Sequence, residues 1–464
     1  MRRVKAWPIM LVAWSGPGSA AGRPSDEDVR DLIKQMNKRI EALEQRHQTD
    51  QERIKNLEQR LAQIEQSDTD EQRKAEAEEI KTEVKEEIKS ELAATQRAGL
   101  FDLSTGAVGS GNALNPQITV FFDTGGSLSS DGSNNALNRF NLREVELDIR
   151  AAISLSVDGV LIVAMHEEIE SEANGDVDID REVDVEEGYL DFHTLPYDLA
   201  LRVGKFRNAF GRNNLLHTHD LPQVTRPLVI RSFFGGEGLT TTGLSLSWLV
   251  PNPWDEYIET TVEVVNADGG HESPILGGPN ADNPAVLGHV KFFHDVTETS
   301  SFEVGGSYLF GHTSDDPDFD ANAFGLDLTY HWDDPDPSRF RSWLVQSELF
   351  WSHNDVDRGP FQSSRNDSFG AYAFAQYQIG QNWYVGLRGD YTEFPNSETR
   401  GADDYDVAVS PYVTWYITEF LRARLQYEHR WFDLDDGSAE EDALFLQFTG
   451  VIGSHPPHPY WVRR

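Results

Sequence analysis

Apolar and polar side chains alternate, residue by residue, through most of the chain after about residue 117. In VELDIRA (145–151) every second residue is apolar, and the residues between them are Glu146, Asp148 and Arg150. LRARLQYEHRW (421–431) shows the same pattern, with arginines between several of its apolar positions. A period of two is the period of a β-strand, whose successive side chains point to opposite faces. We therefore expect long strands with one apolar face and one charged face.

Sixteen such segments are predicted between residues 118 and 452, and the connections between them alternate in length. Short connections such as SVDG, IGQN and ITE alternate with longer acidic ones, of which the run 167–187 is an example. An even number of antiparallel strands, with short turns at one end and long loops at the other, is typical of an outer-membrane β-barrel. The predicted fold class is all-β, a transmembrane β-barrel of about 16 antiparallel strands over residues 117–464.

A barrel of this kind turns its apolar face toward lipid. We therefore expect the bacterial outer membrane as its location, and membrane lipid and lipopolysaccharide as its surroundings. Tryptophans near the predicted strand ends fit an aromatic girdle at the membrane–water boundary. These tryptophans are Trp248, Trp254, Trp332, Trp351, Trp383, Trp415 and Trp431. The short turns are expected on the periplasmic side, and the acidic loops are expected to be solvated outside the cell.

The overall charge and the lack of cysteine exclude several classes of function. The chain has 464 residues, no cysteine and a formal net charge of -38. Most of the negative excess lies after residue 97, which argues against nucleic acid as a partner. The absence of cysteine excludes disulfides, thiolate metal sites and a cysteine nucleophile. No glycine-rich phosphate loop, zinc motif or nucleophile elbow is found, so neither an enzyme nor a bound cofactor is expected.

Three segments precede the predicted barrel. Residues 1–20 have a basic start, a short apolar run and small residues at the end, the pattern of a secretory signal peptide. Residues 25–97 are predicted to form a coiled-coil helix that lies in the periplasm. Residues 98–116 are rich in Gly, Ser and Ala and are predicted to be a linker.

The coiled coil is predicted from a seam of residues spaced alternately three and four apart. The seam consists of Ile33, Met36, Ile40, Leu43, His47, Asp50, Ile54, Leu57, Leu61 and Ile64. One helix with such a stripe must bury it against another, so we expect a homo-oligomer. His47 and Asp50 are interpreted as selectors of register or oligomeric state, with a metal or pH-sensing site as the alternative.

The stretch GRNNLLHTHDLPQVTRPLVIRSFFGGEGL (Gly211–Leu239) has neither the strand period nor a helical stripe. It is the longest predicted connection, between the fifth and sixth strands. A sixteen-stranded barrel is wide enough for an aqueous channel, which an inward-folded loop could narrow. The apolar residues Leu215, Leu216, Leu228, Val229, Ile230, Phe233 and Phe234 are expected to pack against the inner wall. Arg226 and Arg231 are expected to face the pore, and an external lid or a contact between protomers is the alternative.

Histidines occur at two places that could attract a metal. His217 and His219 lie beside Asp220 in the predicted constriction loop, and His455 and His458 lie near the C-terminus. Neither pair has a third ligand close by in the sequence. We therefore predict no metal site and assign His217, His219 and Asp220 to the constriction loop alone.

The strand period also predicts which charged residues of the wall face the lumen. The predicted pore-lining residues are Arg150, Arg202, Arg388, Arg422, Arg424, Arg430, Glu146 and Asp148, with Glu144, Asp390 and Glu428 on the same face. Opposed rows of positive and negative charge would set a field across the pore and influence which ions dwell there.

Three stretches resemble the phosphate-selective porin family (porin O and P type) of Gram-negative outer membranes. They are NLREVELDIRAAISL (141–155), VEEGYLDFHTLPYDLALRVGKFRNAFGRNN (185–214) and TRPLVIRSFF (225–234). The resemblance implies a trimeric sixteen-stranded channel. Selective binding of phosphate does not follow, because the predicted barrel has only two lysines, Lys205 and Lys291. The layout is also similar to sugar porins with a periplasmic coiled coil and to barrels that act as tethers toward the cell wall.

The function predicted from these features is an outer-membrane porin for passive diffusion of small hydrophilic solutes or ions. The alternative is a structural barrel that anchors a periplasmic coiled coil toward the cell wall. No peptidoglycan-binding sequence precedes the helix, which favours the channel. The chemistry of the solute is left open by the sequence.

Overall fold

The computed structural model describes residues 116–131, 137–154, 156–171, 177–268, 273–277, 283–314, 318–357, 363–395, 404–434 and 437–453. The predicted signal peptide and coiled coil lie outside these residues, as does the predicted linker except for its last residue. His455 and His458 lie outside them as well. These assignments therefore stay predictions.

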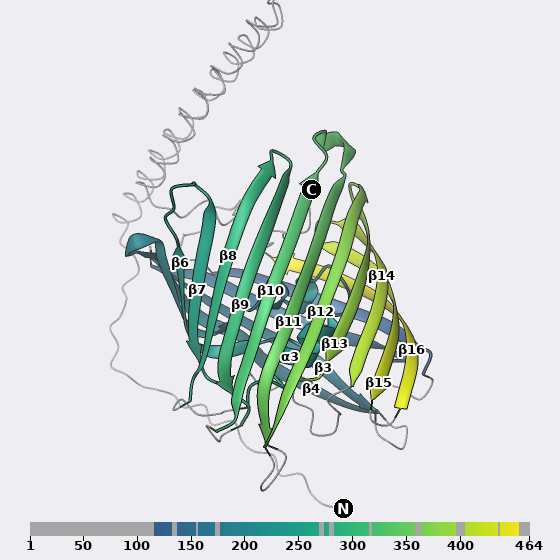
Figure 1. Cartoon of the computed structure of the whole chain (residues 1–464). Coiled ribbons are helices and arrows are strands. Elements are labelled where there is room, and N and C mark those ends of the chain that lie inside the picture. Colours follow the sequence, from purple (N-terminus) through teal and green to yellow (C-terminus); the bar gives the residue numbers. More distant parts are fainter. Residues whose placement is uncertain are drawn as a thin grey trace, which may run out of the picture. The chain divides into compact units, whose positions relative to one another are not determined.

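The described residues form a closed barrel of sixteen antiparallel strands, each paired with its neighbours in sequence, and β1 closes the ring against β16. The strands are β1 (Gln117–Ser129), β2 (Arg139–Ser154), β3 (Val157–Ser171), β4 (Val177–Leu195), β5 (Leu199–Arg207), β6 (Thr240–Leu249), β7 (Tyr257–Val265), β8 (Ala285–Thr297), β9 (Ser300–His312), β10 (Asp320–Asp333), β11 (Ser342–Asp357), β12 (Ser363–Gly380), β13 (Trp383–Glu393), β14 (Tyr405–Thr418), β15 (Leu421–Leu434) and β16 (Gly437–Gly453). Figure 1 shows them as a ring of tilted strands, coloured from blue to yellow. The predicted fold class and strand number are confirmed.

The two faces of the wall differ in polarity, as the strand period predicts. On β15, Leu425 is 43% exposed on the outer face, whereas its neighbours Arg424 and Gln426 point inward and are buried. Outer side chains at equivalent positions are Leu246, Val264, Leu326, Leu387 and Leu446, which are 39–53% exposed. Aromatic residues join this outer face, and the indole rings of Trp383 and Trp415 stack at 5.3 Å. An apolar outer surface of this extent is suited to lipid rather than to water.

Several strands run further than their sequence predicts. The acidic run 167–187, expected as a solvated loop, belongs largely to two strands. Strand β3 ends at Ser171 and strand β4 begins at Val177. Strand β16 likewise begins at Gly437, inside the acidic stretch DDGSAEED. The physical reason is that an antiparallel ladder keeps pairing its backbone groups beyond the apolar band, where both faces can carry charge. The expectation of long loops at these two places is therefore wrong.

The helical elements among the described residues are short. They are η1 (Pro196–Asp198), η2 (Asn213–Leu215), η3 (Thr218–Asp220), α3 (Leu228–Phe234) and η5 (Pro337–Arg339). None of the described helices has the length and apolar character needed to cross a membrane. Three of them, η2, η3 and α3, occupy the long connection between β5 and β6.

Candidate functional site: a folded segment inside the barrel

Most of the connection between β5 and β6, the residues Gly211–Leu239, is here called the β5–β6 segment. Asn214 joins its two ends, because its Nδ2 donates to the carbonyls of Asn208 and Leu239, both at 2.9 Å, and its Oδ1 accepts the Leu239 amide at 2.7 Å. Gly211 has a φ of 65°, and a Cβ atom there would lie 2.4 Å from Oε2 of Glu348. Glycine is therefore required where the segment turns against the wall.

Wall side chains accept hydrogen bonds from backbone amides along the β5–β6 segment. Glu348 on β11 accepts the Asn213 amide at 2.7 Å, and Gln426 on β15 accepts the Val224 amide at 2.7 Å. The amide of Leu228, at the start of α3, donates to Asp390 on β13 at 3.1 Å. These partners all belong to the inward-facing rows of their strands. The segment is thus folded into the barrel and fastened to well-separated parts of its wall.

Arginines of the wall bind carbonyl groups of the same segment. Arg388 donates to the carbonyl of Thr225, Arg422 to that of His219 and Arg424 to that of Gln223. Arg143 on β2 donates to the carbonyl of Val224 at 2.9 Å. Because a buried carbonyl without a donor is costly, these guanidinium groups hold the segment in place.

Helix α3 packs its apolar residues against aromatic residues of the wall. Phe233 and Phe234 are fully buried, and the ring of Phe234 lies 4.9 Å, centroid to centroid, from that of Phe210. The ring of Phe210 in turn meets that of Phe350 on β11 edge-on at 5.0 Å. Leu228, Val229 and Ile230 are also at most 2% exposed.

Leu215 departs from the predicted packing, because its side chain is 43% exposed. It lies in η2 between the buried residues Asn214 and His217. The side chains of Asn214 and His217 make the hydrogen bonds to the chain and the wall at this turn, whereas that of Leu215 stays exposed. The expectation that Leu215 packs against the wall is therefore wrong.

Several of the predicted lumen arginines pair with carboxylates on their own or neighbouring strands. On β2, Arg150 contacts Asp148 at 2.9 Å, and on β5 Arg202 contacts Asp191 at 3.3 Å. On β13, Arg388 contacts Asp390 at 2.7 Å. Arg430 on β15 pairs with Asp406 on β14. Arg388, Arg422 and Arg424 are at most 6% exposed, so they act on the β5–β6 segment. That the set lines a path for solute stays a prediction.

Arg226 and Arg231 differ in their surroundings. Arg226 is 4% exposed and donates to the carbonyls of Gly236 at 3.2 Å and Leu216 at 3.1 Å. Burial lowers the pKa of Arg226 to about 10, so it stays charged at neutral pH. The carbonyls of its own segment thus hold the guanidinium group of Arg226, and that this residue faces the pore stays a prediction. The Arg231 side chain, in contrast, is exposed and makes no hydrogen bond or ion pair with any described residue.

A cavity of about 230 Å³ opens beside this part of the segment. Its lining includes Arg143, Arg226, Arg231, Arg430, Glu428 and Glu441. The cavity is thus bordered by the β5–β6 segment on one side and by strands β2, β15 and β16 on the other. Arg143, Arg226 and Arg430 are held there by neighbouring partners, whereas no hydrogen bond or ion pair with a described residue holds the side chain of Arg231.

The histidines of the segment meet glutamates of β2 and β4. His217 Nδ1 lies 2.8 Å from Glu186 and its Nε2 lies 2.7 Å from Glu187. Burial and the nearby Arg207 would lower the pKa of His217, but Glu146 and Glu186 hold it well above its usual value. Since both ring nitrogens face carboxylates, His217 is protonated and donates from both.

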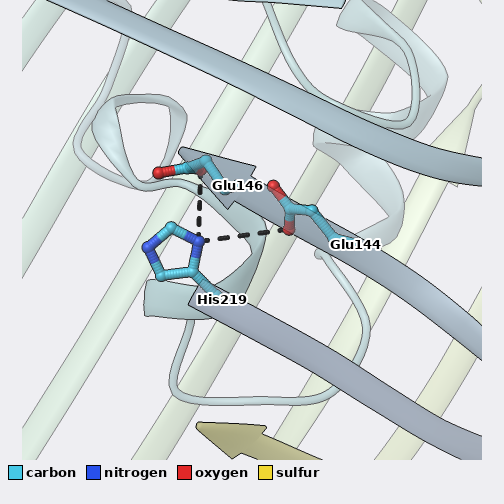
Figure 2. Close-up of side chains that lie close together, drawn as sticks. All are labelled: Glu144, Glu146 and His219. Atoms are coloured by element: carbon cyan, nitrogen blue, oxygen red, sulfur yellow. Dashed lines mark ion pairs between the residues drawn. The ribbon is translucent and has the colours of Figure 1, made fainter. Parts of the chain in front are cut away.

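His219 lies beside a second pair of carboxylates. Its Nδ1 is 3.3 Å from Glu146 and 4.0 Å from Glu144, both on β2. Figure 2 shows the two carboxylates reaching toward this one ring nitrogen. The opposite ring nitrogen, Nε2, lies 3.7 Å from Asp220, and the ring stacks on Phe121 of β1 at 3.9 Å. The imidazole is therefore held with Nδ1 pointing at the wall.

The sequence did not indicate this cluster, because the partners of the histidines come from distant strands. Irregular pairing adds two of them. Glu187 pairs with Ile162 and Val185 with Val163, so Glu186 is an extra residue in the β3–β4 ladder. A β-bulge of this kind turns two consecutive side chains to one face, which a strict period of two does not predict. Glu146 was expected at the lumen face, but not as a partner of His217 and His219.

Comparison with known proteins shows a limited likeness in sequence and a general one in fold. No model of a known protein family matches the chain. An uncharacterized protein of Aquifex aeolicus (strain VF5) is 30% identical over 307 residues, which are 60% of this chain and 63% of that protein. The match thus spans less than two thirds of that relative's length.

Solved structures with a similar fold include an outer-membrane channel and a porin. The outer membrane channel DcaP of Acinetobacter baumannii has a TM-score of 0.48 and 12% identity, over 73% of this chain and 97% of that one. An anion-selective porin from Comamonas acidovorans has a TM-score of 0.47 and 8% identity, over 73% and 99%. At these identities the likeness concerns the fold alone.

Proposed function

We propose that the protein is an outer-membrane porin, through which small hydrophilic solutes or ions diffuse passively. The closed barrel with an apolar outer face and a charged inner face supports this function, because it separates a wet interior from lipid. Only the resemblance of residues 141–234 supports the phosphate-selective type of porin. The barrel has only two lysines, Lys205 and Lys291, and so gives no reason to expect phosphate as the preferred solute.

The observation that carries the proposal is the course of the β5–β6 segment through the lumen. Its amides and carbonyls are bound by wall residues of β2, β11, β13 and β15. A segment so fastened narrows a sixteen-stranded barrel without closing it fully, and the cavity beside Arg231 is the candidate passage. In this proposal the segment is the constriction of the channel.

The proposed assembly rests on the heptad seam from Ile33 to Ile64 for association, and on the resemblance of residues 141–234 for the number of subunits. A homo-trimer would join its coiled coils in the periplasm while the barrels stand side by side in the outer membrane, surrounded by lipid and lipopolysaccharide. Passive diffusion requires no catalytic group, no cofactor and no nucleic-acid partner.

The test is current through purified full-length protein in planar bilayers. Because the chain has no cysteine, Arg231→Cys introduces a single thiol at the proposed passage. A small cationic thiol reagent should reduce the current through this variant. Asp336→Cys is the matched control, because Asp336 lies on an exposed turn between β10 and β11, and its labelling should leave the current unchanged.

Two outcomes would contradict the proposal. Folded protein that inserts but conducts no current would favour the structural tether. Labelling of Arg231→Cys without any change in current would place the passage elsewhere in the lumen.

A further inference from the structure

The buried group formed by Glu144, Glu146 and His219 has a feature that the channel function does not explain. Glu144 is 6% exposed, and neither of its carboxylate oxygens makes a hydrogen bond. Oε2 of Glu146 and Nδ1 of His219 also make none. A buried carboxylate without donors is costly, so a cation is expected to face it.

We propose that Glu144, Glu146 and His219 bind one divalent transition-metal ion of the zinc class. Their ligand atoms all lie within 4.8 Å of one another. Metal–ligand bonds of about 2.0–2.2 Å place the donors of a tetrahedral site roughly 3.3–3.6 Å apart. The 3.3 Å between His219 Nδ1 and Glu146 fits this spacing, and a small side-chain rotation of Glu144 closes its 4.0 Å.

The charges around the group are consistent with a divalent ion. The carboxylates that meet here are Glu144, Glu146, Glu186 and Glu187. Among the described residues, Arg207 and His217 are the basic side chains within ion-pair distance of them, apart from His219 itself. A metal ligand must be a neutral imidazole, so His219 would add no charge of its own. A divalent ion would bring the positive charge that this group of carboxylates lacks.

The chemistry of the donors identifies the class of metal. Magnesium and calcium prefer sites made of oxygen atoms alone, whereas an imidazole nitrogen with carboxylates suits zinc, cobalt, manganese or iron. The second nitrogen of His219 faces Asp220 at 3.7 Å, the kind of outer carboxylate that orients a metal-binding histidine. Stacking on Phe121 fixes the plane of the ring.

A second triad, Glu146, Glu186 and His217, shares one glutamate with the first. We do not assign the metal to it, because both nitrogens of His217 already donate to Glu186 and Glu187 at 2.8 and 2.7 Å. The Glu144 group, in contrast, keeps its oxygens unbonded. A metal there would link η3 of the β5–β6 segment to β2 and so hold the segment against the wall beside this group of carboxylates.

Cobalt(II) is the probe for the experiment, because its visible absorption reports both binding and ligand type. Full-length protein without a polyhistidine tag is stripped with a chelator in detergent and titrated with cobalt, and zinc is then added as competitor. Wild-type protein should bind one equivalent through this site, and zinc should remove the signal. Glu144→Gln and His219→Phe, which keep size and ring stacking, should each weaken binding at least about tenfold.

His289→Phe is the matched control, because His289 is also buried and faces the carboxylate of Asp327 at 3.6 Å. It should bind cobalt like the wild type. Heat-modifiable mobility in gels checks that each variant forms the barrel, and if Glu144→Gln fails to fold, His219→Phe carries the test alone. Absence of cobalt binding by wild-type protein would overturn the proposal. Binding as tight as that of the wild type by both Glu144→Gln and His219→Phe would also overturn it. Loss of binding in His217→Gln but not in His219→Phe would place the metal in the second triad and overturn the assignment.

Discussion

The β5–β6 segment is held to the barrel wall by two contacts of opposite character. At one, α3 presses Phe233 and Phe234 onto Phe210 and Phe350, with no polar group between the rings. At the other, between His217 and Thr225, hydrogen bonds and ion pairs join the segment to the wall at several successive residues. The apolar contact excludes water and tolerates small shifts. The charged contact fixes the position of the segment. Removing one of its partners costs much free energy, because the other partner is then buried and unpaired.

The largest effect is expected when the charged contact is removed together with the first half of α3. Deletion of Asn214–Arg231 should raise single-channel conductance several-fold while the barrel still folds, because the wall strands pair their backbones with one another. Conductance in planar bilayers, with heat-modifiable mobility as the check of folding, measures this. If the segment acted as an external lid instead, deletion would alter gating and leave the open-channel conductance nearly constant.

The charged contact is tested by Arg388→Met. This change removes the donor to Thr225 and leaves Asp390 and Glu428 buried without their cation. Breaking a buried ion pair from one side typically costs about 3–5 kcal/mol. We expect a detached segment, seen as noisier open-channel current and a lower unfolding temperature. Arg150→Met is the control, since its pair with Asp148 is half exposed and should contribute about 0–1 kcal/mol.

The apolar contact is tested by Phe233→Ala, which should weaken the attachment of α3 by about 3 kcal/mol, the lower end of the range for a buried phenylalanine. Rate of cleavage within the segment by added protease gives the measurement. Leu215→Ala is the control, because Leu215 is 43% exposed and its loss should change the cleavage rate little. Similar cleavage of both variants would show that α3 is not held by its apolar face.

The barrel was predictable from the sequence because it follows from a local rule. A period of two assigns each residue to one face, and this suffices for the number of strands and for the inward direction of Glu146 and Arg388. The ends of β3, β4 and β16 were not predictable, because charged residues continue a ladder as readily as they begin a loop. Strand pairing, rather than polarity, decides where such hairpins end.

The site was predictable only in outline. The apolar residues of α3 indicated from composition alone that the segment packs against the inner wall. The carbonyl groups that accept hydrogen bonds from Arg422 and Arg424 could not be predicted. Every residue has a backbone carbonyl, so the sequence does not indicate which of them an arginine will bind. The inward position of Glu186 could not be predicted from the strand period either, because it depends on a bulge in the β3–β4 ladder. Contacts between parts distant in sequence thus determine the chemistry of the lumen.

The smallest structural effect, and the most specific test of the passage, is expected from Arg231→Ala. Arg231 belongs to α3, whose apolar residues hold the segment, yet its own side chain is exposed beside the cavity. Its removal should therefore leave the unfolding temperature unchanged and shift the reversal potential toward cations, because a fixed positive charge at a narrow passage attracts anions. Wild-type protein should show weak anion preference at 1 M salt, where the Debye length is about 3 Å and the acidic outer loops are screened. In dilute salt those loops should favour cations and reduce the difference between the two proteins. Arg339→Ala, a change at an arginine exposed on the β10–β11 turn, should shift nothing, and a shift of equal size there would show that net charge, not position, controls selectivity.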